Sequence, residues 1–318
     1  MDYRISTITA IAKINSLIRL EKLFNSFEVD EKMKLYHNDL NNAKCFHPDI
    51  LFIEYGKIKT ESNSKGFNPK TKKKTYKKKL KNSKRFDNQL TIILSLNENL
   101  INMKLFKNGR VQMTGLKNIE NGKIAIQKII DIIIKINMNV NILFNEDDNE
   151  HDNEHDNEHD NEDDKIGKEE IDIFYDNFKI CLINSDFKFI SKLKRNKLFE
   201  YIVNNTDLIC SYEPCIYPGV KIQFFYNERN DGICKCKDVF CSNKNKDSKC
   251  IKITVAIFES GCTIITGAKS LDQINVTYNY IKNFLTNNVS HFKKIDLDEL
   301  LLKWHFIHLC CKIFKIFI

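Results

Sequence analysis

The stretches KLFKNGRVQMTGLK (Lys104 to Lys117) and AIFESGCTIITGAK (Ala256 to Lys269) repeat one pattern at an interval of 152 positions. Each predicts a strand ending in Phe, a turn closed by Gly, a strand ending in Thr-Gly, and a Lys before a helix. Five pairs are identical: Phe106 and Phe258, Gly109 and Gly261, Thr114 and Thr266, Gly115 and Gly267, Lys117 and Lys269. The repeat predicts two copies of one unit related by a pseudo-two-fold axis, a symmetry that duplex DNA shares.

The charge of the chain is unevenly distributed. The formal net charge of the 318 residues is +8, but residues 146–164 contain twelve Asp or Glu and no Lys or Arg. Without this segment the formal charge rises to +20. A folded part this basic indicates a polyanionic partner. The plainer alternative is a Lys-rich protein from an AT-rich genome.

Several protein classes are not favoured by the sequence. The N-terminus MDYRISTITAIAK has an acidic second residue and no apolar run before a small-residue cleavage site, so we expect no signal peptide. No run of 18 uncharged apolar residues predicts a transmembrane helix. The eleven Cys are therefore expected to be thiols or metal ligands rather than disulfides.

The pattern of each half predicts an α+β unit. In the first half, Arg4 to Ile14 alternates like a strand, Ser16 is a candidate N-cap, and residues 89–96, 101–106 and 110–115 predict further strands before a helix over 123–136. In the second half, residues 178–187 predict a strand, and a helical face, further strands and a last helix from Leu271 follow. Helices on one face of an antiparallel sheet would leave the other face open to a ligand.

The predicted organisation has four parts. A first repeat (1–144) carries a basic insertion (57–85), and a second repeat (169–294) carries a Cys-rich insertion (228–250). Between them, residues 145–168 contain three HDNE repeats and predict a disordered acidic linker, with weak metal capture or screening of the basic insertion as alternatives. The tail (295–318) predicts an amphipathic helix that packs on the body, on a partner or on a membrane surface.

Three motifs identify a family resemblance. LFKNGRVQMTGLK in the first half, and YEPCIYPG (residues 212–219) followed by IFESGCTIITGAK in the second half, resemble the core of the TATA-box-binding protein family. The resemblance covers roughly residues 2–137 and 176–292 apart from the insertions. The large insertions and the composition suggest a TATA-binding-like protein of a large DNA virus or a divergent protist copy.

The resemblance implies a fold and a function. The implied fold is a saddle, with a curved ten-stranded antiparallel sheet and four helices on its convex face. The implied function is a non-enzymatic transcription initiation factor that binds and bends A·T-rich promoter DNA in the minor groove; this family is itself the well-known example of that mode. The minor groove offers a degenerate pattern of acceptors, so apolar fit and deformability supply the selectivity.

The resemblance also assigns site residues. Phe106 and Phe258 match the Phe of each hairpin that inserts between base pairs as a wedge. Tyr217 matches the second wedge of the second half, and Phe86 matches its counterpart in the first half. An alternative register through FHPDILF would place Leu51, and not Phe86, at that position. Thr114 and Thr266 match groove-facing Thr. Further expected DNA contacts are Arg110, Gln112, Ile264, Asn177, Lys117 and Lys269.

Some positions depart from the family pattern. Lys104 and Gln112 are polar where the family is apolar, and the position of the second repeat that is equivalent to Arg110 is Cys262. Asn177 matches a central Asn whose mate in the first half would be Asp2 or Tyr3. The copies are therefore unequal, which predicts a preferred direction on DNA. It also keeps open a second function, a scaffold of the same fold with non-specific DNA or protein binding and a zinc-stabilised loop.

The Cys-rich insertion contains a spacing typical of metal ligands. Cys234, Cys236, Cys241 and Cys250 form CxC-x4-C-x8-C within seventeen residues. Four thiolates suit tetrahedral zinc in a structural site, and zinc would fold a polar loop that burial cannot stabilise. Reduced thiols without a ligand are the alternative. The thirteen basic residues of the 57–85 insertion predict salt-dependent phosphate contacts, a nuclear-localisation signal or a solvated loop.

The expected partners and place of action follow from the resemblance. We expect duplex promoter DNA, a transcription-factor-IIB-like factor and the RNA polymerase machinery as partners, with the protein a monomer on DNA. The expected compartment is the nucleus for a cellular protein, and the nucleus, a cytoplasmic viral factory or the virion for a viral one.

Overall fold

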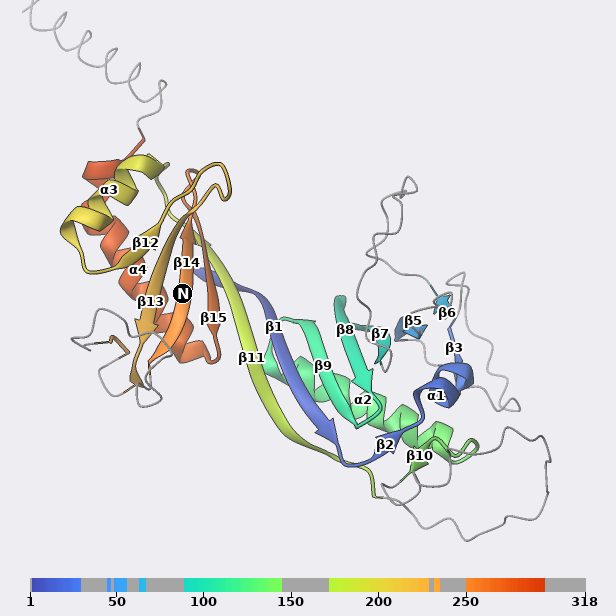
Figure 1. The fold of residues 1–318 in the computed structure, drawn as a ribbon. Coiled ribbons are helices and arrows are strands. Elements are labelled where there is room, and N and C mark those ends of the chain that lie inside the picture. Colours follow the sequence, from blue (N-terminus) through green and yellow to red (C-terminus); the bar gives the residue numbers. More distant parts are fainter. Residues whose placement is uncertain are drawn as a thin grey trace, which may run out of the picture. The chain divides into compact units, whose positions relative to one another are not determined.

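A computed structural model describes residues 2–29, 45–46, 49–55, 63–66, 89–144, 172–228, 232–234 and 250–294. These residues fall into two compact units. The first-repeat unit is Thr7–Cys181, and the second-repeat unit combines Met1–Ser6 with Leu182–Ile318. The division falls inside two long strands, β1 (Tyr3–Ile14) and β11 (Tyr175–Lys188), which open the two repeats (Figure 1).

The first-repeat unit contains an antiparallel sheet in the order β1-β9-β8-β7-β5-β6. After β1, the strands of this sheet are β5 (Ile50–Tyr55), β6 (Asn63–Gly66), β7 (Gln89–Leu96), β8 (Asn99–Phe106) and β9 (Arg110–Leu116). Its helices are α1 (Leu20–Ser26) and α2 (Ile119–Asn137). Two short pairs complete it: β2 (Leu17–Ile18) with β10 (Leu143–Phe144), and β3 (Phe27–Glu28) with β4 (Cys45–Phe46).

The second-repeat unit repeats this order with fewer strands. Its antiparallel sheet runs β11-β15-β14-β13-β12, with β12 (Ile209–Ser211), β13 (Val220–Tyr226), β14 (Ile251–Ile257) and β15 (Cys262–Ala268). Its helices are α3 (Arg195–Asn205) and α4 (Leu271–Phe292). The predicted α+β class, with tandem repeats, antiparallel sheets and four helices, is confirmed for the described residues.

Each core forms between one face of a sheet and its helices. In β9, Val111, Met113 and Leu116 are buried, while the residues between them are more exposed, and β9 packs against α2. The long helix α2 is buried through nine positions, mostly Ile, and it runs beside the strands of its own unit (Figure 1). The other face of each sheet keeps the alternate side chains partly exposed, as the period of two in a strand requires.

The duplication extends to backbone details beyond the identical letters. Asn118 caps α2 by accepting a hydrogen bond from the Asn121 N–H, and Ser270 caps α4 in the same way from Gln273. These caps again stand 152 positions apart. Asn and Ser are favoured at this position because their side-chain oxygens satisfy free N–H groups of the first turn. The helix starts are therefore fixed locally in both repeats.

The two hairpin turns have one geometry. Gly109 and Gly261 adopt φ values of +74° and +82°, and each donates its N–H to the carbonyl of the wedge-position Phe three residues earlier, at 3.0 and 2.9 Å. Their carbonyls accept from Ile14 and Phe189, at the ends of β1 and β11. The turns are thus tied to the opening strand of each repeat.

Two sequence expectations need correction or extension. Ser16 was expected to cap the first helix, but α1 begins at Leu20 after Arg19 and has no side-chain cap, because residues 17 and 18 pair with β10 instead. Inside the basic insertion, residues 63–66 form β6 and pair with β5, which gives the first sheet a sixth strand. The rest of that insertion, the acidic linker (145–168) and the tail (295–318) lie outside the described residues.

We predict that Gly261→Ala destabilises the second-repeat unit. A Cβ at Gly261 would lie 2.5 Å from the Phe189 carbonyl oxygen and 2.8 Å from that of Ser191, both of them backbone atoms. The left-handed backbone adds about 1–2 kcal/mol of strain for any side chain, so we expect a total loss above about 2 kcal/mol in the free energy of unfolding, measured by denaturant titration. The neighbouring Ser260→Ala serves as control, and we expect it to change the free energy of unfolding by about 0.5 kcal/mol. Equal stability of the two variants would contradict this account of the turn.

Candidate nucleic-acid interface

The open face of the first-repeat sheet carries two rows of partly exposed side chains. One row follows the strand register from Thr91 through Lys104 and Gln112 to Ile11. The second row consists of Ile93, Asn102, Thr114 and Thr9. Except for Ile93, which is buried, these residues are half-buried or exposed, and Ile11 is 39% exposed. Apolar and hydroxyl side chains thus stand beside one lysine in the middle of the face.

Basic side chains lie at one end of the same face. Arg110 at the start of β9 pairs in register with Lys13 of β1, and both are exposed. The Arg110 N–H donates to the Asn108 side chain at 3.2 Å, which fixes the backbone where the turn enters β9. Lys104 on β8 adds a third positive charge. Such a set can contact phosphates along the edges of a groove whose floor meets the apolar and Thr side chains.

The open face of the second-repeat sheet has different chemistry at matching positions. Its central row is Lys221, Ala256, Ile264 and Asp186, and the next row contains Gln223, Thr254 and Thr266. Ile264 is 37% exposed and stands where the first repeat has Gln112. Ala256 stands where it has Lys104. Both units therefore present Thr, but the first places a lysine and an amide where the second is apolar.

The acidic residue of this face is paired within its own unit. Arg4 Nε donates to Asp186 Oδ2 at 2.8 Å, and Ser6 also donates its hydroxyl to this carboxylate. Arg4 is highly exposed, and an exposed ion pair contributes only about 0–1 kcal/mol to stability. Its main effect is to offset the negative charge that Asp186 would otherwise present to a phosphate.

An aromatic pair forms at the end of the second-repeat face. The rings of Tyr217 and Phe258 lie 5.8 Å apart between centroids, and Lys221 Nζ lies 4.1 Å from the Tyr217 centroid. Gly219 makes room for them, because a Cβ there would lie 2.9 Å from the Tyr217 ring and 3.2 Å from the Phe258 ring. Both rings remain half-buried. The two predicted wedges of this half are therefore brought together beside a cation.

A network of charged side chains anchors the segment that carries Tyr217. The Arg195 guanidinium donates to the Pro218 carbonyl at 2.5 Å and to Glu259 at 3.2 Å. Lys294 pairs with the other oxygen of Glu259. These bonds hold the pKa of Glu259 below its usual range, first through the Lys294 hydrogen bond and charge and then through Arg195. The Tyr217 segment and the Phe258 turn are thus fixed to the start of α3.

The first repeat shows only part of the matching cluster. Phe106 ends β8, is half-buried and pairs in register with Gln89. Phe86, the predicted second wedge, lies outside the described residues. Leu51, the competing candidate, is the half-buried second residue of β5. The structure thus places Phe106 at the position that matches Phe258 and leaves the choice between Phe86 and Leu51 a prediction.

The predicted central Asn positions lie apart from these rows. Asn177 is exposed in β11 with φ of +51°, which Asn tolerates better than most residues. Asp2 binds Lys282 at 2.8 Å and Tyr3 donates to Asn275 at 2.5 Å, and both of these partners belong to α4. The side chains of Asp2 and Tyr3 are therefore directed to the helix, so neither of them takes part in the rows of the open faces.

The two predicted lysines precede the helix caps. Lys117 and Lys269 are exposed and stand immediately before Asn118 and Ser270. Both lie past the Thr rows, at the ends of β9 and β15. A phosphate contact by either lysine stays a prediction.

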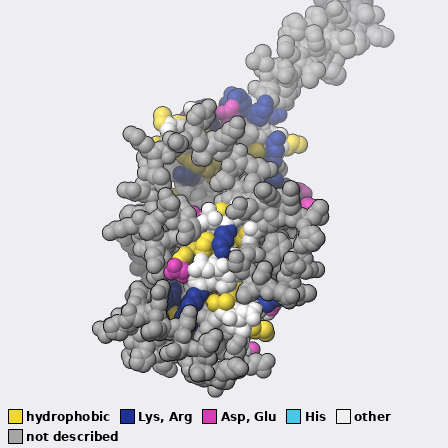
Figure 2. All heavy atoms as spheres, turned by 90° about the vertical axis from the view of Figure 1, so that its right-hand side faces the viewer, with side chains coloured by type: hydrophobic (Ala, Val, Ile, Leu, Met, Phe, Trp, Pro, Cys, Tyr) yellow, Lys and Arg dark blue, Asp and Glu magenta, His cyan; other side chains and the backbone are white. Residues whose placement is uncertain are grey.

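Sequence reasoning missed three residues of the open faces. Ile11, Asp186 and Lys221 share these faces with the predicted set. The signal that could have found them is the alternation with buried neighbours, for example Ala10 and Ala12 around Ile11. Figure 2 shows hydrophobic and basic side chains side by side on the described part of the surface in view.

The predicted zinc ligands are only partly described. Cys234 and Cys250 lie close together, while Cys236 and Cys241 lie outside the described residues. Within the described ranges, no group of three or more His, Cys, Asp or Glu side chains has a metal-binding arrangement. In the same ranges, no helix is long and apolar enough to cross a membrane.

Comparison with known proteins gives relatives of one kind. No family model matches the chain. A TATA-box-binding protein-like protein of Acanthamoeba polyphaga mimivirus is 28% identical over 312 residues, which cover 95% of this chain and 70% of that protein. TATA-box-binding protein 1 of Entamoeba histolytica is 22% identical over 291 residues, covering 88% of each chain. The resemblance to the TATA-box-binding protein family is confirmed.

Two further similarities complete the comparison. TATA-box-binding protein 2 of Entamoeba histolytica is 22% identical over 290 residues, covering 87% of this chain and 96% of that protein. Among solved structures, the TATA-box-binding protein (TBP) of Methanococcus jannaschii has a TM-score of 0.42 and 16% identity, covering 90% of this chain and 99% of that one. The mimivirus relative combines a higher identity than the two Entamoeba relatives with coverage of 95% of this chain.

We predict an acid-dependent loss of stability from Glu259. Because its folded-state pKa is lowered, its ion pairs stabilise the unit above the usual Glu pKa of about 4.5, and this contribution is lost as the pH falls through the lower folded-state value. The melting temperature of the wild type should approach that of Glu259→Gln as the pH falls from 6 toward 3. Glu200→Gln, which breaks an exposed pair with Lys197, is the matched control and should lower the melting temperature at pH 6 by less than Glu259→Gln does. A constant difference between wild type and Glu259→Gln across this range would contradict the prediction.

Proposed function

We propose that this protein is a non-enzymatic transcription initiation factor that binds A·T-rich promoter duplexes through the minor groove and bends them. The relatives support the family of transcription factors, and the open faces support the mode of binding. The single observation that carries the proposal is the duplicated hairpin, which presents Phe106 and Phe258 at matching strand ends and Thr114 and Thr266 at matching positions of the open faces.

The chemistry of the open faces suits the minor groove. Its floor in A·T pairs offers acceptors without the guanine amino group, so Thr hydroxyls can donate while Ile11, Ile264 and Ala256 fit the walls. Aromatic side chains at the strand ends can enter between base steps, a cost that greater contact with the bent duplex offsets. Lys13, Arg110 and Lys221 can bind the flanking phosphates.

The proposal includes partners and a place of action. Bent promoter DNA would be the platform for a transcription-factor-IIB-like factor and the RNA polymerase machinery, with the protein acting as a monomer. The viral and protist relatives support action in a nucleus or a viral factory. The second candidate function, a scaffold with non-specific binding, is favoured by Lys104 and Gln112, which add charge and hydrogen bonding where selectivity would need apolar fit.

The proposed wedges can be tested by truncation. Phe106→Ala combined with Phe258→Ala should remove bending of a labelled TATA-containing duplex, measured by energy transfer between its ends. It should also weaken binding at least tenfold, because one aromatic–base contact contributes about 1–3 kcal/mol. Phe174→Ala is the matched control, since Phe174 is 52% exposed and lies outside the strands of both open faces.

Three outcomes separate the candidates. Loss of bending in the double variant with normal bending in the control supports minor-groove insertion. Binding by the wild type that ignores A·T content and bends no duplex would favour the scaffold. Bending that survives the double variant would overturn the wedge assignment.

Unequal open faces predict directional binding. Lys104 and Gln112 can form polar contacts that Ala256 and Ile264 cannot, so each repeat should prefer its own half of a non-palindromic A·T-rich site. Photocrosslinking from iodouracil placed in either half should label peptides of one repeat about fivefold more than the other, equivalent to about 1 kcal/mol. The variant Lys104→Ala with Gln112→Ile should reduce this bias, and equal labelling by the wild type would contradict it.

A further inference from the structure

We propose that Gln112 accepts a hydrogen bond from the amino group of a guanine in the minor groove. The half of the DNA element bound by the first repeat would then tolerate one G·C pair, whereas the half bound by the second repeat would reject it. This role rests on the proposed minor-groove binding and assigns the reading of one base pair to one side chain.

Gln112 belongs to a two-by-two array of side chains on the open face of the first repeat. Asn102 of β8 pairs in register with Thr114 of β9, and Lys104 pairs with Gln112. All four are half-buried, while Met103 between two of them is buried. Directly opposite residues of an antiparallel pair stand about 4.5–5.5 Å apart. Two carboxamides and one ammonium group are therefore neighbours on this face.

The equivalent array of the second repeat contains no carboxamide and no charge. The residues 152 positions later pair in register in the same way and are Thr254, Ala256, Ile264 and Thr266. Ile264 is 37% exposed, so it presents hydrocarbon to a ligand of this face. The Thr266 hydroxyl donates to Asn184 Oδ1 at 2.5 Å. Gln112 and Ile264 thus place an amide and a hydrocarbon at the same position of the two repeats.

The side chains of Gln112 and Lys104 are available to a ligand. In the part of the chain that the structure describes, neither of them forms a side-chain hydrogen bond or an ion pair. Asp186 on the second-repeat face differs, because Arg4 and Ser6 already donate to its carboxylate. A half-buried amide needs partners for its donors and its acceptor once a ligand covers the face.

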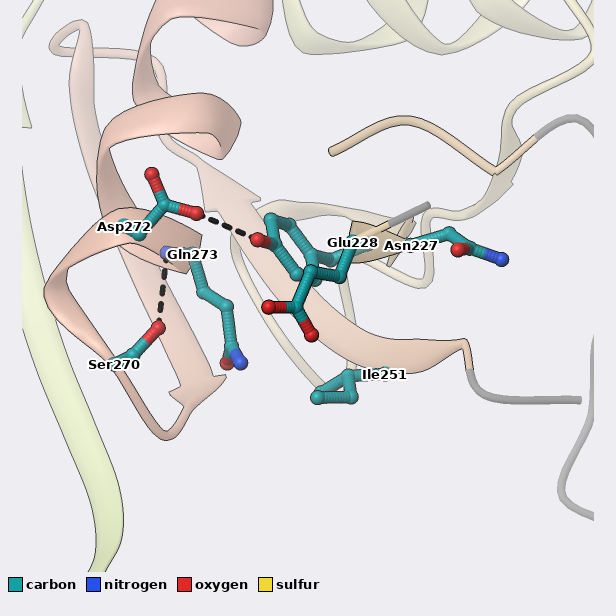
Figure 3. A pocket seen from close by; sticks show the side chains of 7 residues that line it. Asn227, Glu228, Ile251, Ser270, Asp272 and Gln273 are labelled. Carbon is teal, nitrogen blue, oxygen red and sulfur yellow. Dashed lines mark hydrogen bonds between the residues drawn. The ribbon is translucent and has the colours of Figure 1, made fainter. Parts of the chain in front are cut away.

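The pocket beside the start of α4 shows the contrasting case (Figure 3). There Tyr226 donates to Asp272 at 2.5 Å, and Ser270 accepts from the Gln273 N–H at 3.3 Å. The Gln273 side-chain carbonyl in turn accepts from the Lys269 N–H at 2.8 Å. These polar groups are engaged in holding the helix to its own unit, which the amide of Gln112 is not.

The minor groove offers an amide a target that a hydrocarbon cannot use. A·T pairs present only acceptors there, whereas a G·C pair adds the amino group of guanine as a donor. A Gln side chain has a carbonyl acceptor and an amide donor, so Gln112 can accept from this amino group and donate to the neighbouring ring nitrogen. Ile264 would cover the same amino group without an acceptor, which costs affinity. The two repeats should therefore differ in their response to guanine.

The position of Gln112 favours contact with a base over contact with a phosphate. In its row it stands between Lys104 of β8 and Ile11 of β1. Cations for the phosphates are supplied instead by Arg110 and Lys13, which pair at the end of the same face. An uncharged amide binds a phosphate more weakly than these cations do. Gln112 thus contributes to base selection, whereas the cations position the duplex.

Guanine can be compared with inosine at each position of a TATA-containing duplex. Inosine also pairs with cytosine but lacks the amino group, so the ratio of the two affinities isolates that group. At positions contacted by Ile264, guanine should weaken binding about tenfold relative to inosine, since its amino group loses an acceptor. At the position contacted by Gln112, guanine should bind within about twofold of inosine, or more tightly.

Exchanged residues show which repeat contacts which half of the duplex. Gln112→Ile should make the tolerant half reject guanine about tenfold, and Ile264→Gln should make the other half accept it. Gln127→Ile is the matched control, because Gln127 is an exposed glutamine of α2 that donates to Asp131. This control should leave the guanine-to-inosine ratio of both halves unchanged.

Two results would overturn the role of Gln112 and leave minor-groove binding intact. They are equal rejection of guanine by both halves in the wild type, and unchanged tolerance in Gln112→Ile. Affinity that ignores guanine at every position would overturn this role together with the proposed function. If Gln112→Ile does not fold, the wild-type scan and Ile264→Gln decide the outcome, because a second half that still rejects guanine in Ile264→Gln also contradicts reading by the amide.

Discussion

In the described part of each repeat, helices pack against one face of the sheet, and the rest of the unit depends on this packing. The covered face buries the alternate side chains of every strand, such as Val111 and Met113 in β9 or Val255 and Ile257 in β14. The hydrophobic effect of this burial fixes the register, because a slip of one residue would turn the core side chains outward. The same constraint orients Thr and Lys side chains to the open face, so the proposed interface is a consequence of the core.

The two repeats share their framework and differ in their chemistry. Glycines at the hairpin turns, the caps of α2 and α4 and the bonds to the opening strands match at equivalent positions. By contrast, the first repeat has Lys104, Gln112 and Arg110 at the positions where the second has Ala256, Ile264 and Cys262. Framework positions are constrained by sterics and backbone hydrogen bonds, whereas the side chains of the open faces take little part in the core. The two copies could therefore diverge in what they contact without loss of the fold.

Much of the fold could be predicted from the sequence. Alternation predicted β1, β7, β8 and β9, and the long apolar helix appeared where Ile residues dominate. The predicted start of α1 was wrong because Leu17 and Ile18 form a strand that pairs with β10. Local capping signals do not encode such a long-range pairing. The extra strand β6 was missed for a similar reason, since Lys and Ser residues with low strand preference pair there with β5.

The candidate site was predicted through motifs more than through physics. The rings of Tyr217 and Phe258 lie side by side, but the surroundings of Lys221 and Asp186 depend on register and on partners such as Arg4, which no short motif contains. Likewise, Asp2 and Tyr3 were expected at the interface, and their bonds to α4 became visible only with the helix in place. Side-chain direction near the ends of long strands is set by such tertiary contacts.

We propose that the open faces select A·T-rich duplex DNA by its minor groove. Selection of bound duplexes from a random pool at physiological salt tests this claim most directly, because it separates groove selectivity from the attraction of a basic protein to any phosphate backbone. We expect enrichment of an A·T-rich, asymmetric element, with enrichment reduced when guanine amino groups enter the minor groove. Recovery of duplexes without any A·T preference, bound with a steep salt dependence alone, would contradict it.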